Sequence, residues 1–353
     1  MREPTVAVTG LSPLQPGRAV LRALREAMGP SLRLIGLSYD CLEPTNYEAD
    51  LIEASYLIPY PHQGSGPLLD RLRQIHSEKP FDVIFPTLDT ELPLLSRLEG
   101  ELGALGVKVA IPDAESLALR SKARLPEAAE RAGALVPYSR VAHSWEQMWK
   151  VCRDFAFPFF VKGQYFGATL VHNGAAVEAA VGRYVADWGF PVVLQNQVKG
   201  PEYDVIALGD GRGELLGAVP MKKLQLDDKA KAWGGITVED PEMLALARQV
   251  VSSLRWRGIL ELELMRHQES DEIYLIEINP RVPAWGYLAV AAGQNLMHAA
   301  LRVALGEEVA PLPPYRVGVM HARQCFDVVC DLDDYEALVM HGGVDRRPRG
   351  GRS

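Results

Sequence analysis

Several features that define common classes of protein are scarce or missing in this sequence. Only four cysteines occur among 353 residues, and none forms a C-x-x-C pair, so we interpret them as reduced thiols rather than as disulfides or zinc ligands. No apolar run approaches the roughly 20 residues that a membrane helix requires, and the first residues do not resemble a signal peptide. The sequence therefore predicts a cytoplasmic protein without a membrane partner.

Excess positive charge is also missing. The formal net charge is −8 at pH 7, whereas proteins that bind nucleic acid usually present a basic surface, so we expect no nucleic-acid partner. The dinucleotide-binding fingerprint G-x-G-x-x-G is absent too, because Gly10 is followed by Leu-Ser-Pro-Leu-Gln-Pro-Gly. We therefore reject NAD binding as the main function.

The composition nevertheless predicts a large folded protein. With 353 residues, of which 48% are hydrophobic, the chain can bury a sizeable core divided between two or three domains. Residues 1–112 alternate short apolar runs with amphipathic helical segments. Such βαβ alternation predicts a doubly wound parallel sheet.

The most informative motif is the run Tyr274–Arg281, Tyr-Leu-Ile-Glu-Ile-Asn-Pro-Arg. Side chains two residues apart lie on the same face of a strand, so Glu277, Asn279 and Arg281 converge there. Carboxylate and amide oxygens are the hard ligands that Mg²⁺ prefers, usually together with substrate phosphates. A guanidinium beside them suits phosphate or developing negative charge.

A second alternating run, Ile259–Met265, carries Glu261 and Glu263 and is joined to the first by a polar stretch. The two runs predict a β-hairpin with carboxylates on both strands. An exposed edge hairpin with ordinary surface charges is the alternative. The isoleucines that flank the charged residues argue against it, because they predict a buried setting in which unpaired charge is costly.

Two lysines complete the pattern. Lys162 ends the apolar run Pro158–Gly163 and precedes a glycine-containing loop, where an ammonium and backbone N–H groups can both approach phosphate. Taken alone, Lys162 is better interpreted as a surface lysine, and Lys122, in the dipeptide Ser121-Lys122, is a weak signal by itself.

The order of these features along the chain resembles the ATP-grasp superfamily, and in particular its stand-alone carboxylate–amine ligases. The resemblance implies an α/β and α+β fold, in which a doubly wound parallel sheet domain is followed by a two-lobed ATP-grasp domain. We assign the first to residues 1–112 and the second to 113–310, with the small lobe at about 120–198. Residues 311–353 are then a C-terminal extension that ends in a disordered basic tail.

The resemblance also implies a role for each matching residue, with ATP and Mg²⁺ as cofactors and Mn²⁺ as the alternative ion. Lys122 and Lys162 would contact the nucleotide phosphates, and Glu202 the ribose. Glu263, Glu277 and Asn279 would hold the metal ion, with Glu261 as the alternative to Glu263. The strand that bonds adenine would be Gln195, Asn196, Gln197 and Val198.

Catalytic roles fall on Arg281, Lys162 and Lys222. Arg281 would lie beside the γ-phosphate and the acyl phosphate. For Lys222, a contact to the triphosphate or to the substrate carboxylate is balanced against a surface role. Trp285 is a candidate wall of the acceptor pocket, with core packing as its rival. We interpret the segments Gln164–Leu170 and Lys229–Thr237 as a lid and as a mobile loop over the substrate.

The function implied is a ligase that joins a carboxylate to an amine through an acyl phosphate and releases ADP and phosphate. The substrates would be small molecules or peptides, such as amino acids. A carboxylase or a carbamoyl-phosphate-forming enzyme is the alternative, and an ATP-binding scaffold without turnover is less favoured. The sequence leaves the oligomeric state open, although a homodimer formed through the N-terminal domain is common in the superfamily.

Overall fold

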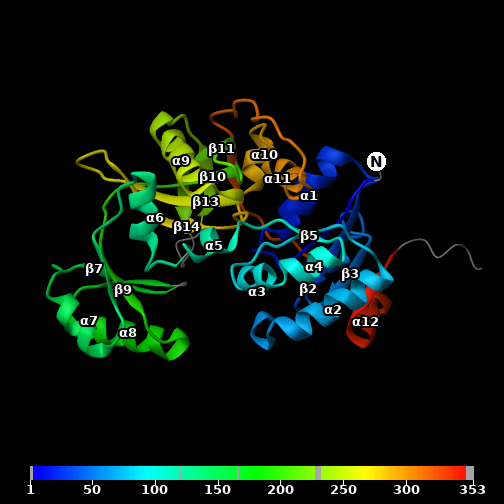
Figure 1. Ribbon diagram of the computed structural model, residues 1–353, viewed down its shortest axis with the longest axis horizontal. Helices are drawn as coiled ribbons and strands as arrows, with labels where there is room; N and C mark the ends of the chain where they lie inside the picture. Colours follow the sequence, from blue (N-terminus) through cyan, green and yellow to red (C-terminus); the bar gives the residue numbers. More distant parts are fainter. Residues whose placement is uncertain (1–2, 120, 165–166, 227–231, 347–353) are drawn as a thin grey trace, which may run out of the picture.

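The structure is a computed structural model that describes residues 3–119, 121–164, 167–226 and 232–346. Its strands form three sheets, and Figure 1 shows them side by side with helices packed around them. Within the described residues, no helix is long and apolar enough to cross a membrane. The predicted α/β and α+β fold class is confirmed, whereas the predicted domain limits stay a prediction.

The N-terminal sheet has the strand order β16-β3-β2-β1-β4-β5, and all neighbours are parallel except β16 with β3. Its central strands are apolar and buried, as expected when helices cover both faces. The strands are β1 Thr5–Val8, β2 Arg33–Ser38, β3 Ala54–Leu57, β4 Val83–Phe85, β5 Lys108–Val109 and β16 Gly343–Asp345. The helices are α1 Gly17–Met28, η1 Pro44–Tyr47, η2 Pro61–Gln63, α2 Ser65–Glu78, α3 Leu92–Arg97, α4 Glu99–Ala104 and α12 Leu332–His341.

The strand order of this sheet creates a switch point between β1 and β4. From β1 the chain runs outward through β2 to β3, and then returns to place β4 on the other side of β1. The loops that follow β1 and β4 therefore diverge, which in doubly wound sheets opens a crevice for ligands. Gly10 follows β1 with φ +69°, and a Cβ there would lie 2.0 Å from the Thr87 hydroxyl, so the close approach of the two loops requires glycine.

The second sheet is small and antiparallel, with the order β6-β9-β7-β8. One face packs on helices α7 and α8 around a core that includes Phe159, Val161 and Leu194. Side chains alternate between faces, so Phe160, Lys162 and Gln195 lie on the other face. The elements are β6 Ser139–Ala142, α7 Trp145–Cys152, β7 Phe159–Gly163, β8 Ala168–Val171, α8 Gly174–Trp188 and β9 Val192–Asn196.

The third sheet is the large antiparallel one, with the order β14-β13-β10-β11-β12-β15. Helices α6 and α9 cover one face of this sheet, and α10 and α11 cover part of the other face. Because α10 and α11 also pack on α1, the large sheet and the N-terminal sheet share a hydrophobic core. The strands are β10 Glu202–Asp210, β11 Leu215–Leu226, β12 Ala232–Thr237, β13 Arg257–Arg266, β14 Ile273–Asn279 and β15 Met320–Ala322. The helices are α5 Ala114–Ala118, α6 Leu125–Ala132, α9 Pro241–Leu254, α10 Tyr287–Ala291 and α11 Leu296–Ala304.

The C-terminal extension returns to both larger sheets. Strand β15 pairs with β12, and strand β16 pairs with β3 beside helix α12, which lies red against the blue elements in Figure 1. Arg346 is the first residue of the predicted basic tail. Its side chain donates to Asp334 at 2.7 Å, so this residue is ordered. Residues 347–353 lie outside the described residues.

Two predicted loops differ from the structure. Residues 232–237 form strand β12 rather than a loop, because they pair with β11 on one side and with β15 on the other. The predicted lid includes Ala168–Leu170, which belong to strand β8. Residues 165–166 of the predicted lid and residues 229–231 of the predicted mobile loop lie outside the described residues.

Candidate active site

A cavity of about 490 Å³ lies where the three sheets meet. The two loops at the switch point contribute Leu14, Gln15, Pro16, Thr87, Leu88 and Asp89. The small sheet and its neighbourhood contribute Lys122, Phe160, Lys162, Gly167, Ala168, Gln195, Asn196 and Val198. The large sheet and the segments beyond it contribute Glu202, Asp204, Lys223, Ala232, Glu261, Glu263, Leu264, Met265, Ile276, Glu277, Ile278, Asn279, Arg281, Ala284, Trp285 and Arg323.

The floor of this cavity is the predicted hairpin, formed by strands β13 and β14. Glu261 stands opposite Asn279 and Glu263 opposite Glu277, so the predicted convergence of carboxylates and amide is observed. Beyond Glu277 the register shifts, because Leu264 pairs with Leu275 and leaves Ile276 as an extra residue. Such a bulge re-aims side chains, and here both Ile276 and Glu277 line the cavity.

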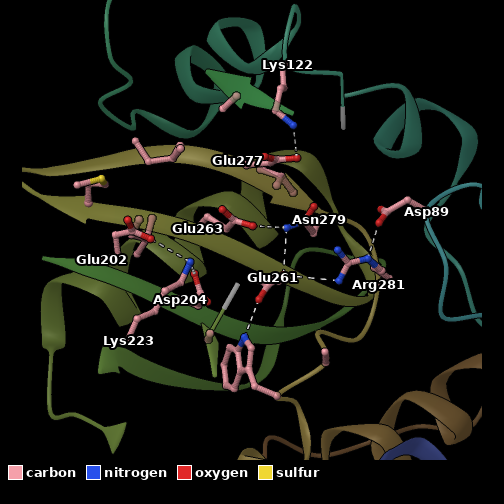
Figure 2. A pocket seen from close by; sticks show the side chains of 18 of the residues that line it. Asp89, Lys122, Glu202, Asp204, Lys223, Glu261, Glu263, Glu277, Asn279 and Arg281 are labelled. Carbon is pink, nitrogen blue, oxygen red and sulfur yellow. Dashed lines mark hydrogen bonds and ion pairs between the residues drawn. The ribbon is translucent and has the colours of Figure 1, made fainter. Parts of the chain in front are cut away.

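The side-chain amide of Asn279 has a defined orientation. Its nitrogen donates to Glu261 Oε2 at 3.0 Å and to Glu263 Oε1 at 2.9 Å (Figure 2). Carboxylates can only accept, so the nitrogen must face them. The oxygen of the amide is therefore the atom left for a cation.

Glu261 and Glu263 differ in their surroundings. Glu261 accepts from the Trp285 indole at 2.6 Å and lies 3.6 Å from the Arg281 guanidinium, so its oxygens are already engaged. Burial raises the pKa of Glu261. Burial also acts to raise the pKa of Glu263, but the Lys223 and Lys122 ammoniums outweigh it and hold that pKa below its usual value. Glu263 is thus the carboxylate more readily available as an anion.

Two lysines lie above the hairpin. Lys122 occupies the turn between α5 and α6, and its ammonium donates to Glu277 at 2.7 Å (Figure 2). Lys162 lies on β7 and is 5% exposed. Its burial lowers its pKa to about 8, although Glu277 acts in the opposite direction. The structure therefore places both lysines that are predicted to bind phosphate on the same side of the predicted metal ligands.

Arg281 has a partner that the sequence analysis missed. Its Nε donates to Asp89 Oδ2 at 2.5 Å, and Asp89 lies in the loop that follows β4 of the N-terminal sheet (Figure 2). The loop that carries Asp89 is held by Glu91, which is fully buried and accepts from the backbone N–H groups of Thr87 at 2.8 Å and Leu88 at 2.9 Å. The orientation of the arginine thus depends on both sheets.

Lys222, for which a catalytic role is predicted, does not line the cavity, whereas its neighbour Lys223 does. The ammonium of Lys223 lies 3.1 Å from Asp204 and 3.4 Å from Glu202, and these carboxylates raise its pKa against the effect of burial. Adjacent residues of a strand point to opposite faces, so Lys222 lies on the face of β11 away from the cavity. The sequence contains a signal for this placement. A β-hairpin whose turn is centred on Arg212 places residue 223 opposite residue 202, so Lys223 and Glu202 share a face.

The predicted adenine strand is only partly in the cavity. Gln195, Asn196 and Val198 line it, whereas Gln197 does not. Glu202, the predicted ribose ligand, lines the cavity beside Lys223. Of the predicted lid, Gly167 and Ala168 line the cavity, and Tyr165 and Phe166 lie outside the described residues.

Four charged lining residues were not predicted from the sequence: Asp89, Asp204, Lys223 and Arg323. Arg323 follows β15, where its backbone N–H bonds the Trp233 carbonyl at 2.9 Å and its guanidinium lies 5.8 Å from the Trp233 ring centroid. No sequence signal marks Arg323, because the pairing of β15 with β12 joins segments about 85 residues apart. Trp285 lines the cavity while 5% exposed, so it is both wall and core.

The donor set fits a hard cation that is also bound by a ligand. Glu263 and Glu277 offer carboxylates, and Asn279 offers its amide oxygen. Within the described residues, no group of three or more His, Cys, Asp or Glu side chains is arranged to hold a metal by itself. Mg²⁺ commonly takes one or two carboxylates and completes its shell with phosphates and water, so these residues suit it.

Comparisons with known proteins agree with this fold and site. A family model described as "ATP-grasp in the biosynthetic pathway with Ter operon" matches residues 190–324. The large chain of carbamoyl phosphate synthase from Thermus thermophilus is 24% identical over 350 residues, and the match covers 89% of this chain but 32% of that protein's length.

Solved structures extend the likeness to the whole fold. A biotin carboxylase–β-γ-ATP complex from Campylobacter jejuni superposes with a TM-score of 0.70 at 16% identity, covering 87% of this chain and 72% of that one. The L-amino acid ligase from Bacillus licheniformis gives a TM-score of 0.67 at 18% identity, covering 88% and 76%. The fold is that of the ATP-grasp proteins, and the predicted resemblance to the ATP-grasp superfamily is confirmed.

Proposed function

We propose that the chain is an ATP-dependent ligase that joins a carboxylate to an amine and releases ADP and phosphate. The observation that carries this proposal is a cavity in which two lysines face a hairpin of three carboxylates and an amide, with an arginine just beyond the end of one of its strands. The likeness to an amino acid ligase and to carbamoyl phosphate synthase supports it.

In this proposal the nucleotide lies between the small and the large sheet. Lys122 and Lys162 neutralise its phosphates, and Glu202 bonds its ribose. Gln195 and the backbone of residues 196–198 face its base. Glu263, Glu277 and Asn279 would hold Mg²⁺, which supplies positive charge to the phosphates; Mn²⁺ is the alternative ion.

The reaction divides into two steps. An oxygen of the substrate carboxylate attacks the γ-phosphorus, and the bond to ADP breaks, which gives an acyl phosphate and ADP. The amine then attacks the acyl carbon, phosphate leaves, and the amine loses a proton. Arg281 stabilises the charge on the transferring phosphoryl group, and Asp89 holds the guanidinium in place.

We assign the substrate end of the cavity to Arg281 and Trp285, next to the loop that carries Asp89. A guanidinium suits a carboxylate, and an indole wall suits an apolar side chain. We therefore propose an amino acid or a small peptide as substrate. A homodimer and a cytoplasmic location stay predictions.

A carboxylase or a carbamoyl-phosphate-forming enzyme is the second candidate. It is favoured by the relatives, since carbamoyl phosphate synthase and biotin carboxylase both share this fold. Bicarbonate-dependent release of ADP, without any requirement for an organic carboxylate, would select this candidate over the amide ligase.

The test uses the full chain with Mg²⁺ and ATP. Release of ADP, AMP and phosphate is measured against pools of amino acids, small carboxylates and bicarbonate. ADP release that needs both a carboxylate and an amine supports the ligase, whereas AMP release refutes the acyl-phosphate route. Binding of ATP without release in any pool would favour the scaffold alternative, and a failure to bind ATP would refute the proposal as a whole.

A further inference from the structure

A short hydrogen-bond chain fixes the side chain of Gln195 at the base end of the cavity. Gln195 lies on β9 directly opposite Ser139 on β6. The nitrogen Nε2 of Gln195 is 3.0 Å from the Ser139 hydroxyl, and that hydroxyl is 2.8 Å from the Pro137 carbonyl oxygen. Gln195 is 4% exposed and lines the cavity.

The direction of each bond follows from the number of protons available. A carbonyl oxygen can only accept, so the Ser139 hydroxyl donates its one proton to Pro137. The same hydroxyl must then accept from Gln195, and only the NH₂ end of the amide can donate to it. The oxygen Oε1 of Gln195 is therefore the amide atom available to a ligand in the cavity.

We propose that this chain, from Pro137 through Ser139 to Gln195, makes the protein select adenine over 6-oxopurines. The inference rests on the nucleotide site proposed above. Oε1 accepts a hydrogen bond from the 6-amino group of adenine, whereas the O6 of hypoxanthine or guanine meets it as a second acceptor. Two acceptors at hydrogen-bond distance repel each other and leave buried polar atoms unpaired. An unpaired buried polar atom discriminates between near-identical ligands more strongly than a change in apolar contacts.

The need for such a chain follows from the residue type. A carboxylate at this position would accept in any orientation, but a glutamine presents either a donor or an acceptor, depending on its rotation. Ser139 removes that ambiguity by engaging the donor end. Apolar side chains around the site, including Phe160 on the neighbouring strand β7, can hold the purine ring without distinguishing one base from another.

The experiment compares the affinities of the full chain for Mg·ATP and Mg·ITP by calorimetry, because inosine differs from adenosine at the edge that Gln195 would contact. The wild type is expected to prefer ATP by about tenfold. Ser139→Ala should reduce this preference at least fivefold by freeing the amide to rotate. Gln195→Glu should keep the preference, and the double variant Ser139→Ala with Gln195→Glu should restore it.

Ser144→Ala is the matched control, since it removes a hydroxyl that caps α7 in the same part of the fold and does not contact Gln195. It should change thermal stability and leave the ATP preference intact. If Ser139→Ala does not fold, Ser139→Cys gives the second measurement, because a thiol keeps the volume but accepts weakly.

Two results would overturn the inference while leaving the proposed ligase standing: equal affinity of the wild type for both nucleotides, or an unchanged preference in a folded Ser139 variant. Binding of neither nucleotide by the wild type would instead refute the nucleotide site, and the inference with it.

Discussion

The two ends of the cavity are built from different chemistry. At the hairpin end, charged groups are paired across elements: Lys122 with Glu277, Arg281 with Asp89, and Lys223 with Asp204. At the base end, Gln195 and Ser139 are neutral and belong to neighbouring strands of one small sheet.

This difference indicates how each end is kept in place. The ion pair of Arg281 with Asp89 links the hairpin to the N-terminal sheet, so the charged end is correctly arranged only when the larger sheets are assembled. The base end needs little beyond the small sheet. Changes at the charged end should therefore reduce turnover and stability, whereas changes at the base end should alter the choice of nucleotide.

The largest effect is expected from Glu277→Gln. A neutral amide cannot replace the carboxylate that faces the metal and Lys122, so ADP release should fall by about 100-fold or more, since even indirect changes around metal sites cost 10–100-fold. The fold should persist, which circular dichroism would show. Glu272→Gln, at the exposed turn of the same hairpin, is the control and should keep full activity. Near-normal turnover of Glu277→Gln would contradict the assigned role.

The second effect concerns stability and separates two adjacent lysines. Lys223→Met leaves Asp204, which is 2% exposed, without its ammonium, and breaking a buried pair in this way typically destabilises by about 3 kcal/mol or more. Burial raises the pKa of Asp204, so the variant should recover stability at low pH as this carboxyl is protonated. Lys222→Met, on the opposite face, should have a free energy of unfolding within about 0.5 kcal/mol of the wild-type value. Equal losses in chemical denaturation would contradict the placement of Lys223.

The hairpin was predictable from the sequence because its information is local. Alternation alone places Glu277 and Asn279 on one face, and the intervening turn is short enough to fix the pairing with Glu261 and Glu263. The fold class followed for the same reason, since strand and helix periods are read within a few residues.

Residues whose position depends on distant pairing could not be predicted in this way. Asp89 meets Arg281 only because the order of strands places β4 next to β1, facing the large sheet. Arg323 enters the cavity through the pairing of β15 with β12. The choice between Lys222 and Lys223 depends on which face of β11 each occupies, because a shift of a single residue along a strand moves a side chain to the other face.

A smaller effect is expected when the link between the sheets is cut. Asp89→Asn keeps the size of the side chain but removes the charge that holds Arg281, so the guanidinium can shift away from the phosphoryl group. Turnover should fall about tenfold, which is less than the roughly 100-fold that a 1 Å misplacement can cost, because the amide oxygen can still accept from the guanidinium. The affinity for ATP should stay within about twofold, because the lysines and the base end are unchanged. An equal loss of ATP affinity would show that the two ends are not independent.

The smallest effect at neutral pH concerns Lys162, whose burial lowers its pKa to about 8 in the free protein. Only the ammonium form attracts phosphate, so ATP affinity should be constant well below pH 8 and should fall above it, by up to about tenfold per pH unit. Binding must then take up a proton at pH 8.5, which calorimetry in two buffers of different ionisation enthalpy detects. Gln195 and Ser139 do not titrate, so the base end does not contribute to this loss. Lys162→Met should abolish the proton uptake, and uptake that survives in this variant would assign the titration to another group.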